Sequence, residues 1–112
     1  MNPNSIVWTI EEAYELIRRI QPDLKPLGFH VALAGGVLNL GYSAKDLDLV
    51  FLPLTNDKAP AIFPLLTYLN IVLGFANTYE DSGMSHDPNP YSPYRDQWQY
   101  PFGGKRIDVF IA

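Results

Sequence analysis

The stretch that decides the fold runs from residue 29 to residue 52 and reads Phe-His-Val-Ala-Leu-Ala-Gly-Gly-Val-Leu-Asn-Leu-Gly-Tyr-Ser-Ala-Lys-Asp-Leu-Asp-Leu-Val-Phe-Leu. It holds two apolar runs, Phe29–Ala34 and Asp46–Leu52. Short apolar runs bounded by Gly or Pro are typical of buried strands. The intervening residues 37–41 are too few for a full helix and predict a single turn. Two strands joined by a Gly-Gly turn are therefore expected at the centre of the fold.

A helix is predicted before this stretch. Thr9 and Glu12 have the spacing of a capping box, and apolar residues follow at helical intervals as far as Ile20. We expect the helix to end before Pro22, because the residue before a proline disfavours helical backbone. Residues 23–28 predict one more short turn, which ends at a glycine.

A second helix is predicted in the apolar segment that follows residues 55–57, and it is expected to end at Gly74. Residues 55–57 offer N-cap side chains, Pro60 fits a first turn, and Pro64 is expected to kink or restart the helix. The segment from 59 to 79 lacks charged residues and is long enough to cross a bilayer, but its prolines and its short apolar centre favour a buried core helix.

The last third of the chain predicts less regular structure. Residues 75–79 could form a strand, and residues 106–111 form a β-branched run that predicts a final strand. Residues 80–104 contain four prolines with many Gly, Ser, Asp and Asn, which favours a long loop. The resulting order of elements predicts an α+β (mixed α/β) fold, with a small mixed sheet packed against two main helices.

The composition limits the protein's class. A chain of 112 residues with 47% hydrophobic and 18% charged residues fits one globular domain, residues 1–112. The net charge of −4 argues against a broad nucleic-acid-binding face. The chain has no cysteine, which excludes thiolate chemistry and fits a reducing compartment, so a cytoplasmic location without membrane attachment is expected.

Three acids lie in unusual places for carboxylates. Asp46 and Asp48 are in one predicted strand, and Asp108 is in the final one. Asp is depleted in strands, and residues two apart in a strand project from the same face. Asp46 and Asp48 therefore face the same way, and Asp108 joins them if the two strands are neighbours.

Three converging carboxylates repel one another unless cations neutralise them. An all-oxygen set of ligands favours Mg²⁺ or Mn²⁺, which act on substrate phosphates. These acids could instead face water at strand ends, paired with Lys45, Lys105 and Arg106.

The complete pattern resembles a known signature. Leu33-Ala34-Gly35-Gly36, nine further residues and then Asp46-Leu47-Asp48-Leu49 resemble the motif of the polymerase-beta-like nucleotidyltransferase superfamily. Residues 41–50 look most like the head domain of CCA-adding enzymes and bacterial poly(A) polymerases, and residues 106–109 resemble the later strand that carries the third carboxylate. Residues 37–40 depart from the CCA-type head, which has an Arg and an Asp there.

The resemblance implies a minimal nucleotidyltransferase fold and a set of roles. Asp46, Asp48 and Asp108 would be the catalytic residues and would bind two Mg²⁺ or Mn²⁺ ions, with Asp108 helping to activate an attacking hydroxyl. Gly35 and Gly36 would hold the triphosphate of an incoming NTP. Ser43 and Lys45 belong to the same motif, and Lys45 would either contact phosphate or offset the carboxylate charge.

The implied activity is transfer of a nucleotidyl group from an NTP to a hydroxyl acceptor, which could be an RNA end, a protein or a small molecule. The alternative is an inactive module of the same fold that binds nucleotide or a protein. Residues 84–102 leave further alternatives open, because they hold five aromatic residues. They could form a lid that stacks a base, a satellite core, or a surface for a protein partner or a second copy.

Overall fold

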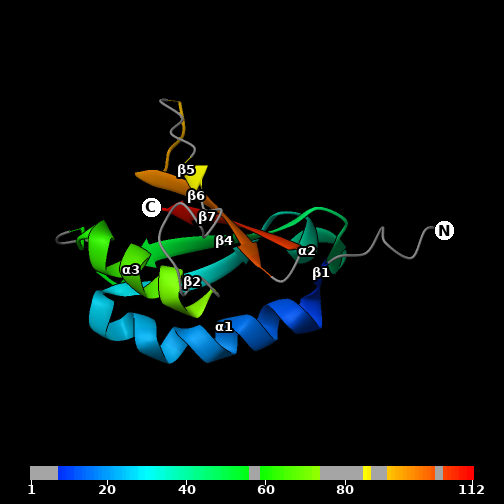
Figure 1. The fold of residues 1–112 in the computed structure, drawn as a ribbon, viewed down its shortest axis with the longest axis horizontal. Coiled ribbons are helices and arrows are strands. Elements are labelled where there is room, and N and C mark those ends of the chain that lie inside the picture. Colours follow the sequence, from blue (N-terminus) through cyan, green and yellow to red (C-terminus); the bar gives the residue numbers. More distant parts are fainter. Residues whose placement is uncertain (1–7, 56–58, 74–84, 87–90, 103–104) are drawn as a thin grey trace.

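The computed structural model describes residues 8–55, 59–73, 85–86, 91–102 and 105–112. Its main feature is a five-stranded mixed sheet with the strand order β2-β4-β7-β6-β5 (Figure 1). The central pair β4 and β7 is parallel, and the other neighbouring pairs are antiparallel. The strands of this sheet are β2 (Phe29–Ala34), β4 (Asp46–Pro53), β5 (Ser85–His86), β6 (Asp96–Phe102) and β7 (Lys105–Ile111).

The two faces of the sheet differ because its strands alternate in polarity. One face carries apolar side chains that are completely buried, among them Leu47 and Leu49 on β4 and Ile107 and Val109 on β7. The helices α1 (Ile10–Leu24) and α3 (Ile62–Val72) pack on this face and lie on the same side of the sheet in Figure 1. The opposite face therefore receives the alternate residues of β4 and β7, which include the acids.

The first helix begins as predicted and ends later than predicted. Thr9 and Glu12 form the capping box. The predicted end before Pro22 is wrong, because α1 continues to Leu24. Ile20 and Leu24 are 2% and 0% exposed, and their burial outweighs the hydrogen bond that Pro22 cannot donate. A 3₁₀ turn (Lys25–Leu27) follows and ends at Gly28.

The predicted kink in the second helix is also absent. Helix α3 begins at Ile62, so Pro64 lies in its first turn, where a missing N–H disturbs no helical hydrogen bond. Its N-cap is Ala61 rather than a residue in 55–57. The described helices include none long and apolar enough to cross a membrane.

The residues between the first two main strands form short elements. Helix α2 (Gly35–Leu40) is the predicted single turn, and it ends at Gly41 in the left-handed conformation. Tyr42–Ser43 (β3) then pairs with Trp8–Thr9 (β1) in a separate two-stranded sheet. This small sheet ties the start of α1 to the segment that leads into β4.

The prediction of a loop over residues 80–104 is wrong for part of that segment. Residues 96–102 form β6, which pairs with β7 along its full length. Three of the four prolines precede β6, and Pro101 lies near its end, so they leave the strand intact. Tyr100 is fully buried and Trp98 packs against the core, so these two rings do not form a base-stacking lid.

The described elements confirm the predicted α+β class with a small mixed sheet and two main helices. The predicted strand at residues 75–79 lies outside the described residues. The nucleotidyltransferase fold implied by the resemblance stays a prediction.

Candidate metal centre

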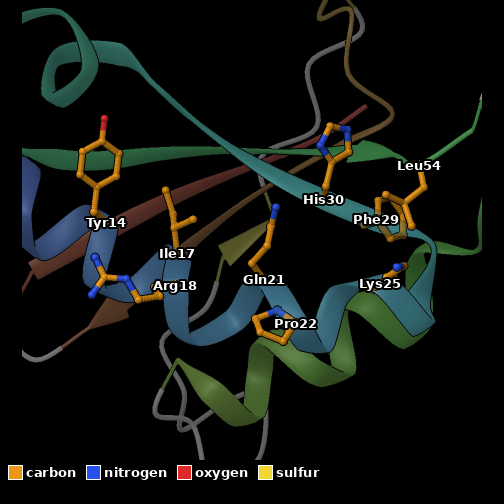
Figure 2. Close-up of a pocket in the computed structure, with 9 residues that line it drawn as sticks. All are labelled: Tyr14, Ile17, Arg18, Gln21, Pro22, Lys25, Phe29, His30 and Leu54. Carbon is orange, nitrogen blue, oxygen red and sulfur yellow. The ribbon is translucent and has the colours of Figure 1, made fainter.

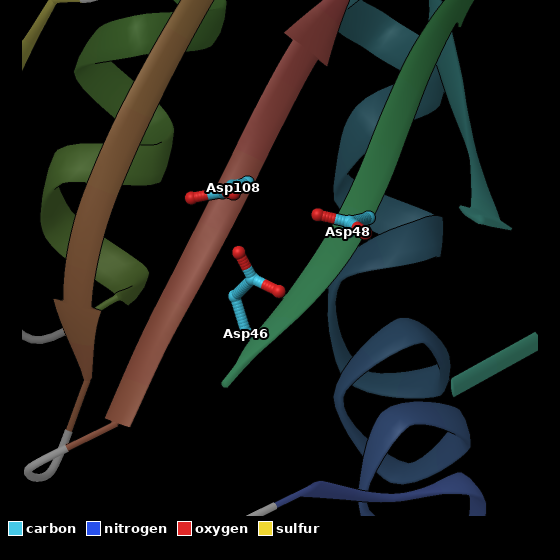
Figure 3. Close-up of side chains that lie close together, drawn as sticks. All are labelled: Asp46, Asp48 and Asp108. Carbon is cyan, nitrogen blue, oxygen red and sulfur yellow. The ribbon is translucent and has the colours of Figure 1, made fainter. Parts of the chain in front are cut away.

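The three acids converge because β4 and β7 are parallel neighbours. Asp48 lies directly opposite Asp108, and Asp46 lies opposite Arg106. One carboxylate oxygen from each of the three acids lies within 4.8 Å of the others (Figure 3). The predicted convergence is therefore confirmed, and it joins residues that are about sixty positions apart in the sequence.

Gly35 makes room for one of these carboxylates. Its backbone has φ +68°, in the left-handed region, and a Cβ placed on it would lie 1.8 Å from Oδ2 of Asp48. An alanine there would combine a strained backbone with a direct clash. At Gly36 the same Cβ would have only ordinary contacts, 3.7 Å from the Tyr42 carbonyl oxygen and 3.8 Å from Ser43 Cβ. Close approach of Asp48 therefore explains the first glycine of the pair and leaves the second unexplained.

Ser43 shapes the turn that leads into β4. Its Oγ accepts hydrogen bonds from the backbone N–H of Lys45 at 3.2 Å and of Asp46 at 3.3 Å. The hydroxyl thus fixes the backbone immediately before the first acid. The expected nucleotide contacts of Gly35, Gly36, Ser43 and Lys45 stay predictions.

Arg106 supplies positive charge to the cluster from the same strand as Asp108. Its Nη2 donates to Asp46 Oδ2 at 2.6 Å, and its Nε lies 3.1 Å from Asp108 Oδ1. The second contact lacks hydrogen-bond geometry, so Asp108 Oδ1 is buried without a hydrogen-bond partner among the described residues. The side chain of Arg106 is about half exposed, at 47%, whereas the side chains of Asp46 and Asp108 are 20% and 15% exposed.

The surroundings push the carboxyl pKa values apart. Burial raises the pKa of Asp108 to about 7, and the hydrogen bond with Asp46 and the negative charge of Asp46 act in the same direction. Burial and the charge of Asp46 raise the pKa of Asp48 to about 6. Burial alone would raise the pKa of Asp46, but hydrogen bonds with Asp108 and Arg106 outweigh it and hold that pKa below its usual range.

These features fit a divalent cation. The donors are carboxylate oxygens, which hard cations prefer, and a buried oxygen of Asp108 has unused hydrogen-bonding capacity. The raised pKa values of Asp48 and Asp108 show that negative charge is costly at this place without a cation. Asp46, Asp48 and Asp108 can therefore hold a metal ion together.

Strand β6 contributes residues that the sequence-based prediction missed. Gln99 lies opposite Asp108, and Gln97 lies opposite Phe110 on the same face. These residues line a small cavity of about 30 Å³ beside Asp108, a volume that can accept a water molecule. The alternation of Gln97, Trp98, Gln99 and Tyr100 is a strand pattern that could have revealed this wall of the site.

Lys105 lies away from the acidic cluster. Its Nζ pairs with Glu12 and lies 4.7 Å from the centre of the Trp8 ring. Of the basic residues considered as partners for the three acids, Arg106 is the one whose ion pairs reach the cluster.

Comparison with known proteins adds no family assignment. No protein-family model matches the chain, and no curated protein matches it.

Proposed function

We propose that the protein is a metal-dependent nucleotidyltransferase that moves a nucleotidyl group from an NTP to a hydroxyl acceptor. The observation that carries this proposal is the convergence of Asp46, Asp48 and Asp108 within 4.8 Å on adjacent parallel strands. The Gly35-Gly36 turn supports it, because Gly35 lies directly against Asp48.

Under this proposal the three carboxylates hold Mg²⁺ or Mn²⁺, and the resemblance implies two such ions. Divalent ions, when bound, stabilise negative charge on a phosphoryl group that is being transferred. Asp48 is kept in place by its contact with the Gly35 backbone, and Ser43 fixes the approach to Asp46. Asp108 helps to activate the attacking hydroxyl, as the resemblance implies.

The glycine pair binds the phosphates of the nucleotide. A Gly-Gly turn lets backbone amides come close to a phosphate, and no side chain at these positions blocks the approach. Lys45 is the nearest basic residue in the sequence to the acids of β4, and it either contacts phosphate or offsets their charge. The acceptor is an RNA end, a protein or a small molecule.

Arg106 must give way for a cation to bind Asp46 and Asp108. Its guanidinium already contacts both carboxylates, so a metal ion competes with it for these two side chains. The exposed guanidinium can turn toward water without breaking the core. Arg106 thus offsets part of the negative charge of the cluster until the metal binds.

The test is transfer of labelled nucleotide from each α-³²P-NTP, with Mg²⁺ or Mn²⁺, to the protein itself, to RNA ends and to small alcohols. We expect Asp46→Asn, Asp48→Asn and Asp108→Asn each to lower the rate by about 10²-fold or more, since metal stabilisation is worth several kcal/mol. Glu15→Gln is the matched control, because it removes an exposed carboxylate outside the cluster. Equal labelling by all five proteins would contradict the proposal.

A second candidate is an inactive module of the same fold that binds nucleotide or a protein partner. The observation that favours it is Arg106, which forms ion pairs with two of the three acids without any metal. Thermal melting separates the candidates when it is combined with the labelling assay. An inactive module that binds nucleotide is stabilised by Mg²⁺ with an NTP but transfers nothing, because stabilisation requires binding alone.

A further inference from the structure

A groove of about 570 Å³ lies between α1 and the beginning of β2 (Figure 2). It is separate from the acidic cluster, because Asp48 lies opposite Ala34, at the other end of β2. Its volume falls within the range of pockets that hold small organic ligands. The metal centre makes no use of this groove, so the groove is a candidate for a second, independent binding site.

The groove is lined largely by apolar side chains that reach the surface. Tyr14 and Leu54 are 49% and 45% exposed, and Ile17 and Pro22 of α1 lie between them along the groove. Phe29 also lines the groove, but it is only 1% exposed and belongs to the core, so it offers a ligand no free surface. Exposed apolar surface gains free energy when an apolar ligand covers it. These side chains therefore fit an apolar ligand body that lies along α1.

The groove is long rather than round. Tyr14 and Lys25 both line it, and they are eleven positions apart in α1 and the turn that follows it. At the rise of an α-helix this separation is about 16 Å. Figure 2 shows the lining side chains spread along the helix and the strand rather than gathered around one point. The groove therefore suits a ligand that is longer than it is wide.

Basic groups line the groove, and carboxylates do not. Arg18, Lys25 and His30 belong to it, and its described lining residues include no Asp or Glu. The chain as a whole has a net charge of −4, so it repels anions on average. A local set of basic groups on an acidic protein favours an anionic ligand at this place.

Lys25 is better placed than Arg18 to meet an anion. The exposed ammonium group of Lys25 forms no ion pair or hydrogen bond with the residues that the structure describes. Asp23, two positions away, instead accepts a hydrogen bond from the Tyr68 hydroxyl at 2.7 Å. Arg18 lies 3.6 Å from Glu15, whose carboxylate would repel an anion bound there. The acidic end of a ligand is therefore expected at the Lys25 end of the groove.

The backbone around Lys25 is held in place without a ligand. The N–H of Gly28 donates to the Lys25 carbonyl at 3.0 Å, and the N–H of Leu54 donates to the Gly28 carbonyl at 2.9 Å. These bonds tie the turn after α1 to the residue that follows β4. On the strand side, His30 adds a ring nitrogen that can donate a hydrogen bond. Because this end is preformed, a ligand pays little free energy to order it.

We propose that this groove binds a small organic anion with an elongated apolar body, the chemistry shared by fatty acids and aryl carboxylates. The acidic group meets Lys25, and the apolar body lies along α1 toward Tyr14. Gln21 keeps its hydrogen bond to the Val31 N–H, so α1 and β2 stay as they are. This site does not depend on the metal centre or on the proposed transferase activity.

The test uses two fluorescent probes with the same ring skeleton and the full chain, in EDTA so that the acidic cluster holds no metal. Anilinonaphthalene sulfonate carries a negative charge, and N-phenylnaphthylamine lacks it. We expect saturable binding of the anionic probe. Dodecanoate and naphthoate then compete with this probe, and the stronger competitor shows whether the groove prefers an aliphatic or an aromatic body.

Charge variants locate the binding site. Lys25→Gln should weaken binding of the anionic probe by about fivefold and change binding of the neutral probe by less than about twofold. Arg18→Gln should have a smaller effect, about twofold, on the anionic probe. Arg19→Gln is the matched control, because it removes the same charge from an exposed position of α1 outside the groove.

A ¹H–¹⁵N correlation spectrum separates the groove from α3, whose exposed Phe63 and Ile71 offer another apolar surface. On addition of the anionic probe, the backbone amide of Leu54 and the side-chain amide of Gln21 should shift. The backbone amide of Thr67, which is exposed on α3, should not shift.

Four outcomes would overturn the proposal. The first is the absence of saturable binding of the anionic probe, or of competition by both dodecanoate and naphthoate. The second is an equal effect of Lys25→Gln on the two probes, which would remove the role of charge. The third is an effect of Arg19→Gln as large as that of Lys25→Gln, which would show that binding follows the overall charge. The fourth is a shift at Thr67 without a shift at Leu54, which would place the probe on α3.

Discussion

The two ends of β2 lie in surroundings of opposite character. At its carboxyl end, Ala34 is opposite Asp48, and Gly35 follows in direct contact with the same side chain. At its amino end, Phe29 and His30 line a groove whose charged residues are basic. One short strand thus connects a cluster of partly buried acids to an exposed, basic and apolar groove.

The two ends of β2 depend on the fold in different ways. The acidic end concentrates negative charge where the sheet partly buries it, so it depends on close packing and on a compensating cation. The groove end is lined mainly by exposed side chains of α1, such as Tyr14 and Arg18, which contribute little to the core. Substitutions should therefore affect the acidic end strongly and the groove end weakly.

The largest effect is expected from Gly35→Ala. The new Cβ would meet Asp48 Oδ2 at 1.8 Å on a backbone with positive φ, so either the strand end or the acid must move. We expect a loss of about 2–4 kcal/mol in the free energy of unfolding, measured by urea denaturation. Gly36→Ala, with contacts of 3.7 Å and longer, should change stability by less than about 0.5 kcal/mol. Equal losses in the two variants would show that Asp48 does not press against Gly35.

The next largest effect is expected in the free energy of unfolding of the metal-free protein, which should depend on pH. The folded pKa values of Asp48 and Asp108, about 6 and about 7, lie above the ordinary value of 3.8. A raised folded pKa means that the native state holds the proton more tightly, so this stability is complete at low pH and is lost as pH rises through 6 to 7. The pKa of Asp46 is lowered in the folded protein, so the stability that Asp46 contributes is lost as pH falls rather than as it rises.

Between pH 5 and pH 8 we therefore expect the metal-free protein to lose roughly 1–2 kcal/mol of unfolding free energy, after allowance for solvent screening. Added Mg²⁺ should restore most of the loss at pH 8, and Asp108→Asn should flatten the profile. Urea denaturation in EDTA at several pH values measures this effect. A profile that rises toward pH 8 would show that the acids are not buried as a group.

A smaller effect is expected from Arg106→Gln. Without the guanidinium, Asp46 and Asp108 lose their ion pairs, and the metal-free protein should be less stable by about 1 kcal/mol. The stabilisation by Mg²⁺ should increase, because the cation no longer competes with Arg106. Lys105→Gln is the matched control, since Lys105 pairs with Glu12 instead. Thermal melting with and without Mg²⁺ measures both changes, and identical responses of the two variants would remove Arg106 from the cluster.

The sequence pattern predicted the acidic end far better than the groove. The Gly-Gly turn and the alternation around Asp46 and Asp48 are local signals, and they led to the right strands. The parallel pairing of β4 with β7 has no local signal, since it depends on how the whole chain folds. From the sequence, the convergence of Asp108 with Asp46 and Asp48 could therefore be expected only if the two strands were neighbours.

Two of the errors share a physical cause, which is that tertiary packing overrides local preference. Pro22 breaks local helix rules, yet burial of Ile20 and Leu24 on either side of it keeps α1 intact. Prolines in 80–104 suggested a loop, yet pairing with β7 forms β6 in that segment. The groove was not predicted at all, because α1 and β2 meet along it only in the folded chain.

The smallest effect is expected at the groove end, from Gln21. Gln21→Ala removes the acceptor of the Val31 N–H, but Gln21 lines the groove, so water can enter in place of its side chain. We expect a loss of about 0.5 kcal/mol in stability and faster hydrogen exchange of the Val31 amide. Gln21→Glu keeps an acceptor oxygen of the same reach and should retain the slow exchange. A loss in Gln21→Ala as large as that of Gly35→Ala would mean that this edge supports the fold, and the contrast between the two ends of β2 would fail.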